Sequence, residues 1–123
     1  MTVEHPASLS ALRQVFANNT YVAIDFTAAW CGPCKVIGPV FEKLSAQHAI
    51  PGTFAFAKVD VDEAQDIARE YGISAMPTFM FFKEGKQVAV NGQSLIRGAD
   101  AKSLSAAVAK IGGLAKKRAE EKK

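Results

Sequence analysis

The chain has 123 residues, of which 49% are hydrophobic and 22% are charged, so it can bury one core and is not intrinsically disordered. Its formal net charge is +3, but residues 110–123 alone carry +4, which leaves the rest of the chain at −1. The basic character therefore belongs to the C-terminal end, and the domain itself lacks the charge pattern of a nucleic-acid-binding protein.

Hydrophobic periodicity and turn residues predict alternating helices and strands along the chain. In order, we expect a helix at 8–17, a strand at 21–27, a helix at 35–47, a strand at 54–60, a short helix at 63–70, strands at 78–82 and 87–90, and a helix at 100–111. The order βαβ followed by ββα predicts an α/β fold with a central mixed sheet and helices on both faces. We expect one domain over residues 1–111 and a charged, flexible tail over 112–123, because Gly112-Gly113 should end the last helix.

The two cysteines, Cys31 and Cys34, fall between the first predicted long strand and the helix that follows it. Their spacing puts them about one helical turn apart, so a disulfide can close and open with little backbone movement. If the helix begins near Cys31, its free N–H groups and dipole favour a thiolate there and make Cys31 the nucleophile. Cys34, one turn further in, should be less exposed and should resolve the mixed disulfide.

Two other uses of a cysteine pair fit the sequence less well. A structural zinc site needs four ligands, and beyond the cysteines the chain offers only His5 and His48, which are far apart in sequence. A purely structural disulfide is typical of small secreted domains without a core, whereas this chain has room for a core. The sequence therefore favours reversible thiol chemistry.

The first residues have neither the basic start nor the apolar run of a secretory signal, and no stretch has the length of a membrane span. We expect a cytoplasmic protein that does not bind membranes. The basic run Lys116-Lys117-Arg118 fits a solvated terminal charge cluster, or a weak address for the nucleus or an anionic surface.

Three segments together give the chain a family resemblance. They are the run from Ile24 to Lys35 that contains Trp30-Cys31-Gly32-Pro33-Cys34, then Gly38-Pro39, then Met76-Pro77-Thr78 before a Phe-rich strand. In this order and spacing they resemble the thioredoxin family from about residue 8 to 111. The stretch 87–97 is also similar to that of thioredoxins from lower eukaryotes.

The resemblance implies a thioredoxin fold and a general protein-disulfide reductase, an electron-carrier protein in cell redox homeostasis. In such a protein Cys31 attacks the client disulfide and Cys34 resolves the mixed disulfide. It implies no bound cofactor other than the redox-active disulfide, with electrons coming from NADPH through thioredoxin reductase. The expected partners are that reductase and disulfide-containing clients such as peroxiredoxins and reductases, with no nucleic acid, and the expected state is a monomer.

Asp25 is a carboxyl group inside a strand that should be covered on both faces. Burial of an unpaired carboxylate is costly, so its pKa should be raised and the group can exchange a proton with Cys34 as general acid and base. The plain alternative is a structural polar residue satisfied by backbone or water. Lys58, by resemblance, lies near Asp25 and tunes it, although a lysine reaching solvent at the sheet edge is also compatible.

Several further residues should surround the cysteines. Trp30 precedes the nucleophile and, by resemblance, lies on the rim of a substrate groove. Pro33, with Gly32, restricts the loop and should favour the reducing side, unlike the His in the CGHC motif of disulfide isomerases. By resemblance Met76-Pro77 has a cis peptide bond, which would leave the backbone of Met76 free to pair with an extended client.

The region before the last helix departs from the family pattern. The segment 85–98 is longer than the usual final hairpin and has a second turn signal at Asn91-Gly92. Arg97 directly precedes Gly98, where family members usually present a small or apolar residue beside the groove. An exposed Arg97 would favour acidic partners, or it would simply protect an edge strand from pairing.

Two other functions are compatible with the same fold. An oxidant or isomerase would need a less reducing motif and an export signal, and neither is found in this sequence. A redox-independent binding subunit would use the groove for docking and would retain its function without the cysteines. The sequence favours the reductase.

Overall fold

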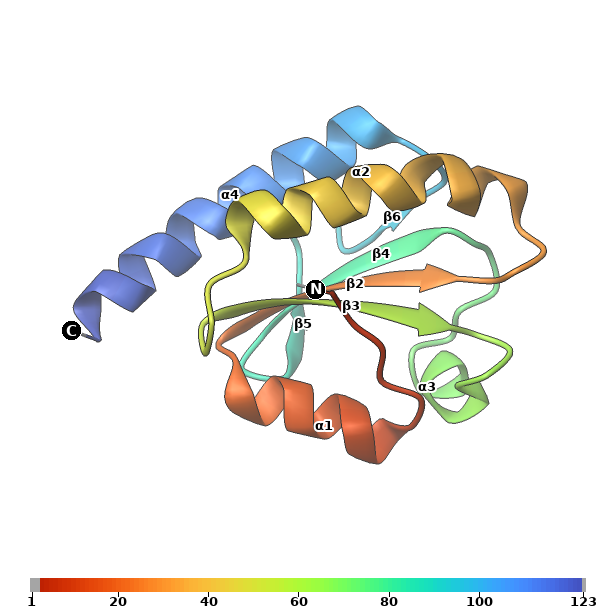
Figure 1. The fold of residues 1–123 in the computed structure, drawn as a ribbon, viewed down its shortest axis with the longest axis horizontal. Helices are drawn as coiled ribbons and strands as arrows, with labels where there is room; N and C mark the ends of the chain where they lie inside the picture. The colour runs from red at the N-terminus through yellow and green to blue at the C-terminus, as the bar shows by residue number, and fades with distance from the viewer. Residues whose placement is uncertain (1–2, 123) are drawn as a thin grey trace.

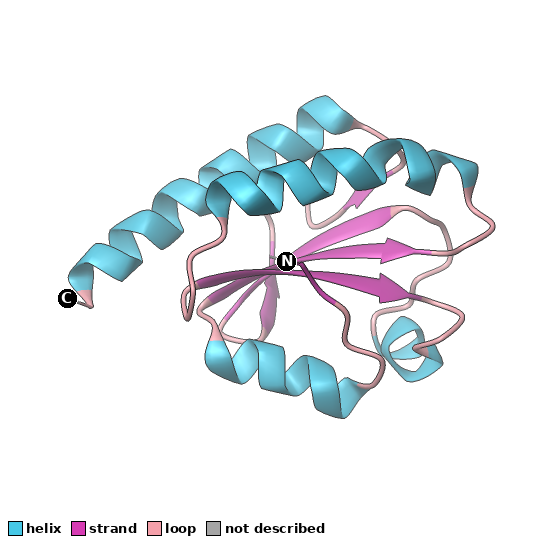
Figure 2. Ribbon diagram, viewed as in Figure 1, coloured by secondary structure: helices cyan, strands magenta, loops and turns pink. Residues whose placement is uncertain are grey.

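The computed structural model describes residues 3–122 as a mixed sheet between two layers of helices (Figures 1 and 2). The elements are β1 (Val3–Glu4), α1 (Leu9–Asn18), β2 (Tyr21–Thr27), α2 (Gly32–His48), β3 (Phe54–Asp60), α3 (Gln65–Glu70), β4 (Thr78–Lys83), β5 (Lys86–Val88), β6 (Ile96–Arg97) and α4 (Ala101–Glu121). None of the helices in this part of the chain combines the length and apolar character needed to cross a bilayer.

The sheet has the strand order β1-β3-β2-β4-β5, and β6 pairs with the same strand, β4, as β5 does. β1, β3 and β2 are parallel, whereas β4 is antiparallel to β2, β5 and β6. Figure 1 shows α2 and α4 on one face of the sheet and α1 and α3 on the other. The predicted α/β class with a mixed sheet and helices on both faces is therefore confirmed.

The central strand β2 is buried along its whole length and divides its side chains between two hydrophobic clusters. Tyr21 and Ala23 pack under α2 and α4, whereas Val22, Ile24 and Phe26 pack on the α1 and α3 side. Because neighbouring side chains of a strand point to opposite faces, Asp25 faces α2.

The structure corrects several predicted element boundaries. β2 and β3 have the predicted bounds, but α2 begins at Gly32 rather than at residue 35, because Cys31 and Pro33 fit the cap and first turn of a helix. α3 begins at Gln65 rather than at 63, because Asp60 Oδ1 accepts the N–H groups of residues 62 and 63 and holds them in a turn. The two-residue strands β1 and β6 were too short for periodicity to reveal.

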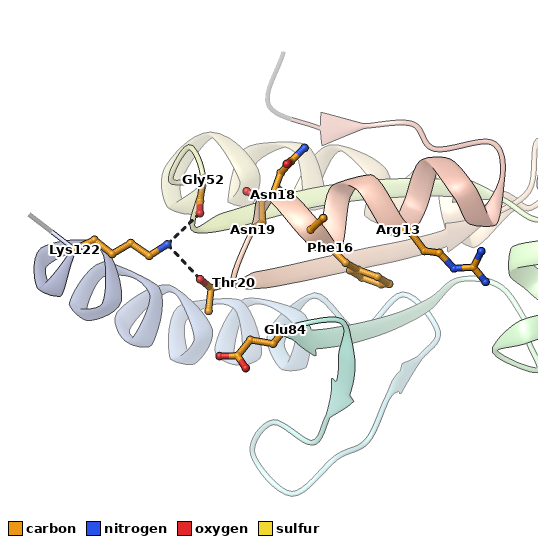
Figure 3. Close-up of a pocket in the computed structure, with 9 residues that line it drawn as sticks. Arg13, Phe16, Asn18, Asn19, Thr20, Gly52, Glu84 and Lys122 are labelled. Atoms are coloured by element: carbon orange, nitrogen blue, oxygen red, sulfur yellow. Dashed lines mark hydrogen bonds between the residues drawn. The ribbon is translucent and has the colours of Figure 1, made fainter.

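The prediction that the last helix ends at Gly112-Gly113 is wrong, because α4 continues to Glu121. Its added turns pack against the body: Ala115 is completely buried, and Gly112 lies so close to His48 of α2 that an added Cβ would be 2.6 Å from Nδ1. Near the end of the helix, Lys122 Nζ donates to the carbonyl of Gly52 at 3.4 Å and to Thr20 Oγ1 at 3.5 Å (Figure 3). Burial and these contacts hold the glycine pair in helical conformation. The flexibility expected for residues 112–123 stays a prediction.

We expect Gly112→Ala to destabilise the protein, although alanine is the better helix former. Overpacking of a filled site costs about 1–3 kcal/mol, since the His48 ring must move. Gly113→Ala is the matched control: nothing lies within 4 Å of its added Cβ, so this variant should be neutral or gain up to about 1 kcal/mol. Equilibrium urea unfolding followed by circular dichroism measures both. If the two variants were equally stable, the close approach of α2 and α4 would not constrain residue 112.

Candidate active site

Cys31 and Cys34 form a disulfide at the start of α2, with their Cα atoms 5.3 Å apart. Cys31 is the N-cap residue of α2, and the backbone N–H of Cys34 donates to Cys31 Sγ at 3.2 Å. After reduction the same N–H would face a free sulfur at the positive end of the helix dipole. This geometry favours a thiolate on Cys31.

The cysteines are buried to the same extent, each with 4% of its surface exposed. The prediction that Cys34 is less exposed than Cys31 is therefore wrong for the disulfide form. Cys31 is covered because Ala28, Val61 and Met76 pack around the pair, and its Sγ lies 3.6 Å from the carbonyl oxygen of Met76. Two loops distant in sequence thus enclose the disulfide. The spacing of the two cysteines along one helix does not predict this covering.

Asp25 is 1% exposed, and neither of its carboxyl oxygens has a hydrogen-bond partner. Burial raises the pKa of Asp25 to about 7, the positive charge of Lys58 opposes that rise, and the negative charge of Glu42 adds to it. A carboxyl group with this pKa exists in both protonation states near neutral pH, as general acid–base work requires. The predicted rise in pKa is confirmed, whereas the catalytic role stays a prediction.

Lys58 is the direct neighbour of Asp25 in the pairing of β2 with β3, and it is half-buried. Its ammonium group extends under α2, where it would lie 3.8 Å from a Cβ at Gly38. A pocket beside it is also lined by Thr27, Cys34 and Asp60. Lys58 therefore lies within electrostatic reach of Asp25, and solvent can approach between Lys58 and Cys34.

Trp30 is a large apolar side chain at the surface, with 69% of its area exposed. Its Nε1–H donates to Asp62 Oδ2 at 2.9 Å, which ties the indole ring to the loop between β3 and α3. The sequence placed Trp30 on the rim, but it did not point to Asp62. The acidic run from Asp60 to Glu63 after a buried strand was a signal for a capped turn, yet a contact across 32 residues cannot be read from spacing.

Met76, in the loop before β4, packs against the disulfide. The Met76-Pro77 peptide bond is cis, as predicted. The N–H of Gly98 donates to the carbonyl of Pro77 at 2.9 Å, and Arg97 is the register partner of Thr78. Arg97 is exposed and Gly98 is half-buried, and the groove role predicted for Trp30, Met76, Pro77, Arg97 and Gly98 stays a prediction.

Gly32 and Pro33 are exposed in the first turn of α2, and their effect on the redox equilibrium stays a prediction. Within residues 3–122 no three His, Cys, Asp or Glu side chains are grouped so that they could hold a metal ion. The Cys31–Cys34 disulfide at the start of α2 supports an exchange between dithiol and disulfide.

Comparison with known proteins agrees with this site. Residues 6–110 match the family Thioredoxin. A thioredoxin-like protein of Fusarium culmorum is 60% identical over 116 residues, which is 94% of this chain and 96% of the relative. A thioredoxin of Neurospora crassa is 50% identical over 95% of this chain and 92% of its own length.

The chain belongs to the thioredoxin family. The solved structure of the Malassezia sympodialis thioredoxin is 46% identical and superimposes with a TM-score of 0.76 over 89% of this chain and 90% of that one. A structure concerned with thiol resolution in a yeast mitochondrial 1-Cys peroxiredoxin through glutathione and thioredoxin systems is 34% identical, with a TM-score of 0.75 over 89% of this chain and 95% of that one. The predicted thioredoxin fold is therefore confirmed, and the Cys31–Cys34 pair is the dithiol–disulfide centre of this thioredoxin.

We expect Asp25→Asn to stabilise this thioredoxin at high pH. A carboxyl group whose pKa is raised by folding stabilises the folded state at low pH, and that contribution is lost as pH rises through the folded pKa. The advantage of the variant should therefore grow between about pH 4 and pH 7 and reach a few kcal/mol, since each pKa unit is worth about 1.4 kcal/mol.

Urea unfolding of the disulfide form at several pH values measures this difference. The control is Glu63→Gln, which removes a carboxylate that is exposed to solvent. A wild type and an Asp25→Asn variant that lose stability in parallel over this pH range would contradict the assignment of the titrating group to Asp25.

We expect Asp62→Ala to free the Trp30 indole, because it removes the acceptor of the Nε1–H bond. Trp30 is the only tryptophan of the chain, so its fluorescence reports this site alone. The steady-state anisotropy should fall and quenching by acrylamide should rise. Asp62→Asn keeps an oxygen acceptor and should stay near the wild type. Identical anisotropy in Asp62→Ala and Asp62→Asn would show that the bond does not hold the ring.

Proposed function

We propose that this thioredoxin is a general protein-disulfide reductase that cycles between the Cys31–Cys34 dithiol and disulfide. The observation that carries the proposal is the position of Cys31 as N-cap of α2, with the N–H of Cys34 directed at its sulfur. The buried carboxyl group of Asp25, with its pKa near 7, supports the proposed proton transfer.

In the first step the Cys31 thiolate attacks one sulfur of a client disulfide. A mixed disulfide forms between Cys31 and the client, the client's own S–S bond breaks, and its second sulfur leaves as a thiolate. The N–H donor at Cys31 favours the attacking thiolate, and Trp30 and Met76 form the two sides of the approach. An extended client would pair with the backbone of Met76. Because this pairing uses the client's main chain rather than its side chains, it would allow a broad range of substrates.

In the second step Asp25 accepts the proton of the Cys34 thiol as this sulfur attacks Cys31 Sγ. The mixed disulfide breaks, the remaining client sulfur leaves as a thiolate, and the Cys31–Cys34 disulfide closes. The client has then gained two electrons, and the thioredoxin has lost two. Lys58 tunes the proton transfer, because its positive charge opposes the rise in the pKa of Asp25.

The electrons for the next cycle come from NADPH through thioredoxin reductase in this proposal, and no cofactor is bound by the chain itself. Peroxiredoxins are the client class suggested by the structural neighbour concerned with the yeast 1-Cys peroxiredoxin. A reducing compartment such as the cytoplasm suits this direction of electron flow, because the oxidised form must be reduced after each turnover.

The reduction potential of the Cys31–Cys34 pair, measured against defined thiol–disulfide buffers, tests the proposal. We expect a potential below that of the glutathione pool, so that the dithiol gives electrons to client disulfides. A potential near or above that of the pool would indicate an oxidant or isomerase. Full function of a Cys31→Ser, Cys34→Ser double variant in a client assay would indicate a redox-independent binding subunit.

We expect Cys34→Ser to accumulate a stable mixed disulfide with a client, whereas Cys31→Ser should form none, because only Cys31 begins the reaction. Mass spectrometry under non-reducing conditions distinguishes the two.

In single-turnover experiments at pH 7, Asp25→Asn should form the mixed disulfide normally but resolve it at least about ten-fold more slowly, since a positioned base contributes that much or more. Unchanged resolution in Asp25→Asn would remove Asp25 from the mechanism.

A further inference from the structure

Arg97 is a cationic side chain in β6. It pairs with Thr78 of β4, two residues after Met76, whose carbonyl oxygen lies beside Cys31 Sγ. Cys31 Sγ lies 3.6 Å from the Met76 carbonyl, and the next carbonyl, that of Pro77, accepts the N–H of Gly98 at 2.9 Å. Arg97, directly before Gly98, is the register partner of Thr78, directly after Pro77. The backbone of β4 therefore fixes Arg97 relative to Cys31.

The sheet register gives the lateral distance between Arg97 and the cysteine loop. Phe26, near the end of β2, pairs with Thr78, which pairs in turn with Arg97. Neighbouring strands lie about 4.8 Å apart, so Arg97 is displaced by roughly 10 Å from β2, the strand that leads to Cys31. An extended client advances about 3.4 Å per residue, so it would cross this lateral distance in roughly three residues.

The side chain of Arg97 is exposed to solvent, and Asp100, its acidic neighbour in sequence, is hydrogen-bonded to Ser103. Ile96 packs into the core under α2 and α4, and Arg97 is exposed on the other face of β6. Asp100 is engaged elsewhere: its Oδ1 accepts the N–H of Ser103 at 3.0 Å, and its Oδ2 accepts the Ser103 hydroxyl at 2.7 Å. The exposed guanidinium is therefore free to meet a client.

The acidic residues of the site lie on its other side. Asp60 pairs with Thr27 at the end of β2, and Asp62 and Glu63 follow it in the loop before α3. Because β3 and β6 lie on opposite sides of the pair β2 and β4, the acidic residues at the end of β3 and Arg97 of β6 lie on opposite sides of that pair. The positive charge of Arg97 therefore attracts a client carboxylate that lies on the β6 side.

We propose that Arg97 is a specificity-determining residue that favours client disulfides with an acidic side chain within about three residues of the attacked cysteine. The inference rests on the reductase function proposed above and narrows its substrate class. Arg97 does not take part in the bond exchange. Its positive charge attracts the acidic side chain of the client during the encounter and in the mixed disulfide.

A different explanation of the same residue is protection of an edge strand. β6 pairs only with β4 among the strands of the described chain, and a charged side chain discourages further strands from adding there. A glutamate would protect the edge as well as an arginine does. Reversal of the charge at position 97 therefore separates the two explanations.

The test uses two synthetic peptides with the same disulfide, one with Asp and one with Lys two residues from the attacked cysteine. The second-order rate of oxidation of the reduced protein is followed by stopped-flow fluorescence of Trp30. An exposed charge pair is worth about 0.2–1 kcal/mol, so the wild type should prefer the acidic peptide by about 1.4- to 5-fold at low salt. The preference should largely vanish in about 1 M salt, where such charges are screened.

Arg97→Glu should reverse the preference, and Arg97→Gln should abolish it. The matched control is Lys86→Glu, which makes the same charge change at an exposed position of β5, opposite Lys83 at the far end of β4. This control should keep the wild-type preference. An unchanged circular dichroism spectrum and reduction potential confirm that each variant retains the fold and the dithiol centre, and Arg97→Gln supplies the measurement if Arg97→Glu does not fold.

Equal rates of the wild type with both peptides would overturn the role of Arg97 and leave the reductase function intact. Reversal of the preference by Lys86→Glu would also overturn it, because the overall charge of the protein would then explain the effect. Failure of the wild type to reduce either peptide would instead refute the reductase function itself.

Discussion

The passage of α2 across the sheet directly after β2 determines how this thioredoxin works. Four residues, 28–31, connect a fully buried strand to the helix above it, so the helix N-terminus must lie at the end of the central strand. Cys31 thereby becomes the N-cap, and Cys34 lies over the face of the sheet that Asp25 occupies. Val61 from the loop after β3 and Met76 from the loop before β4 pack against the disulfide. A short connection thus places the two cysteines over the face of the sheet that carries the buried carboxyl group.

The same arrangement carries a cost in stability. Asp25 has no hydrogen-bond partner for either oxygen, and its ionisation opposes folding by about 4 kcal/mol if the pKa rises from 3.8 to about 7. A fold can tolerate this because the rest of β2 packs completely on both faces. With a pKa raised to about 7, the carboxyl group is present in both protonation states near neutral pH.

The sequence was sufficient for features that depend on local pattern and on the family motifs, but not for contacts between distant segments. Periodicity identified the buried strands β2 and β3, and the motifs identified the cysteine pair, Asp25 and the cis proline. The bond from Trp30 to Asp62, the covering of Cys31 by Val61 and Met76, and the fit of Gly112 against His48 depend on tertiary packing. Because this packing cannot be read from the sequence, Gly112-Gly113 was wrongly predicted to end the last helix.

The extended helix α4 also determines where the molecule can be joined to another domain or to a solid support. Its C-terminal end lies at the opposite end of the molecule from the start of α2, where the disulfide is found (Figure 1). Lys122 Nζ donates to Thr20 just before β2 and to the carbonyl of Gly52 in the turn before β3. A fused domain, a surface linker or a purification handle placed after it would be joined at the end of the molecule opposite the start of α2. The position also suits immobilisation on an electrode or bead with the disulfide facing solution.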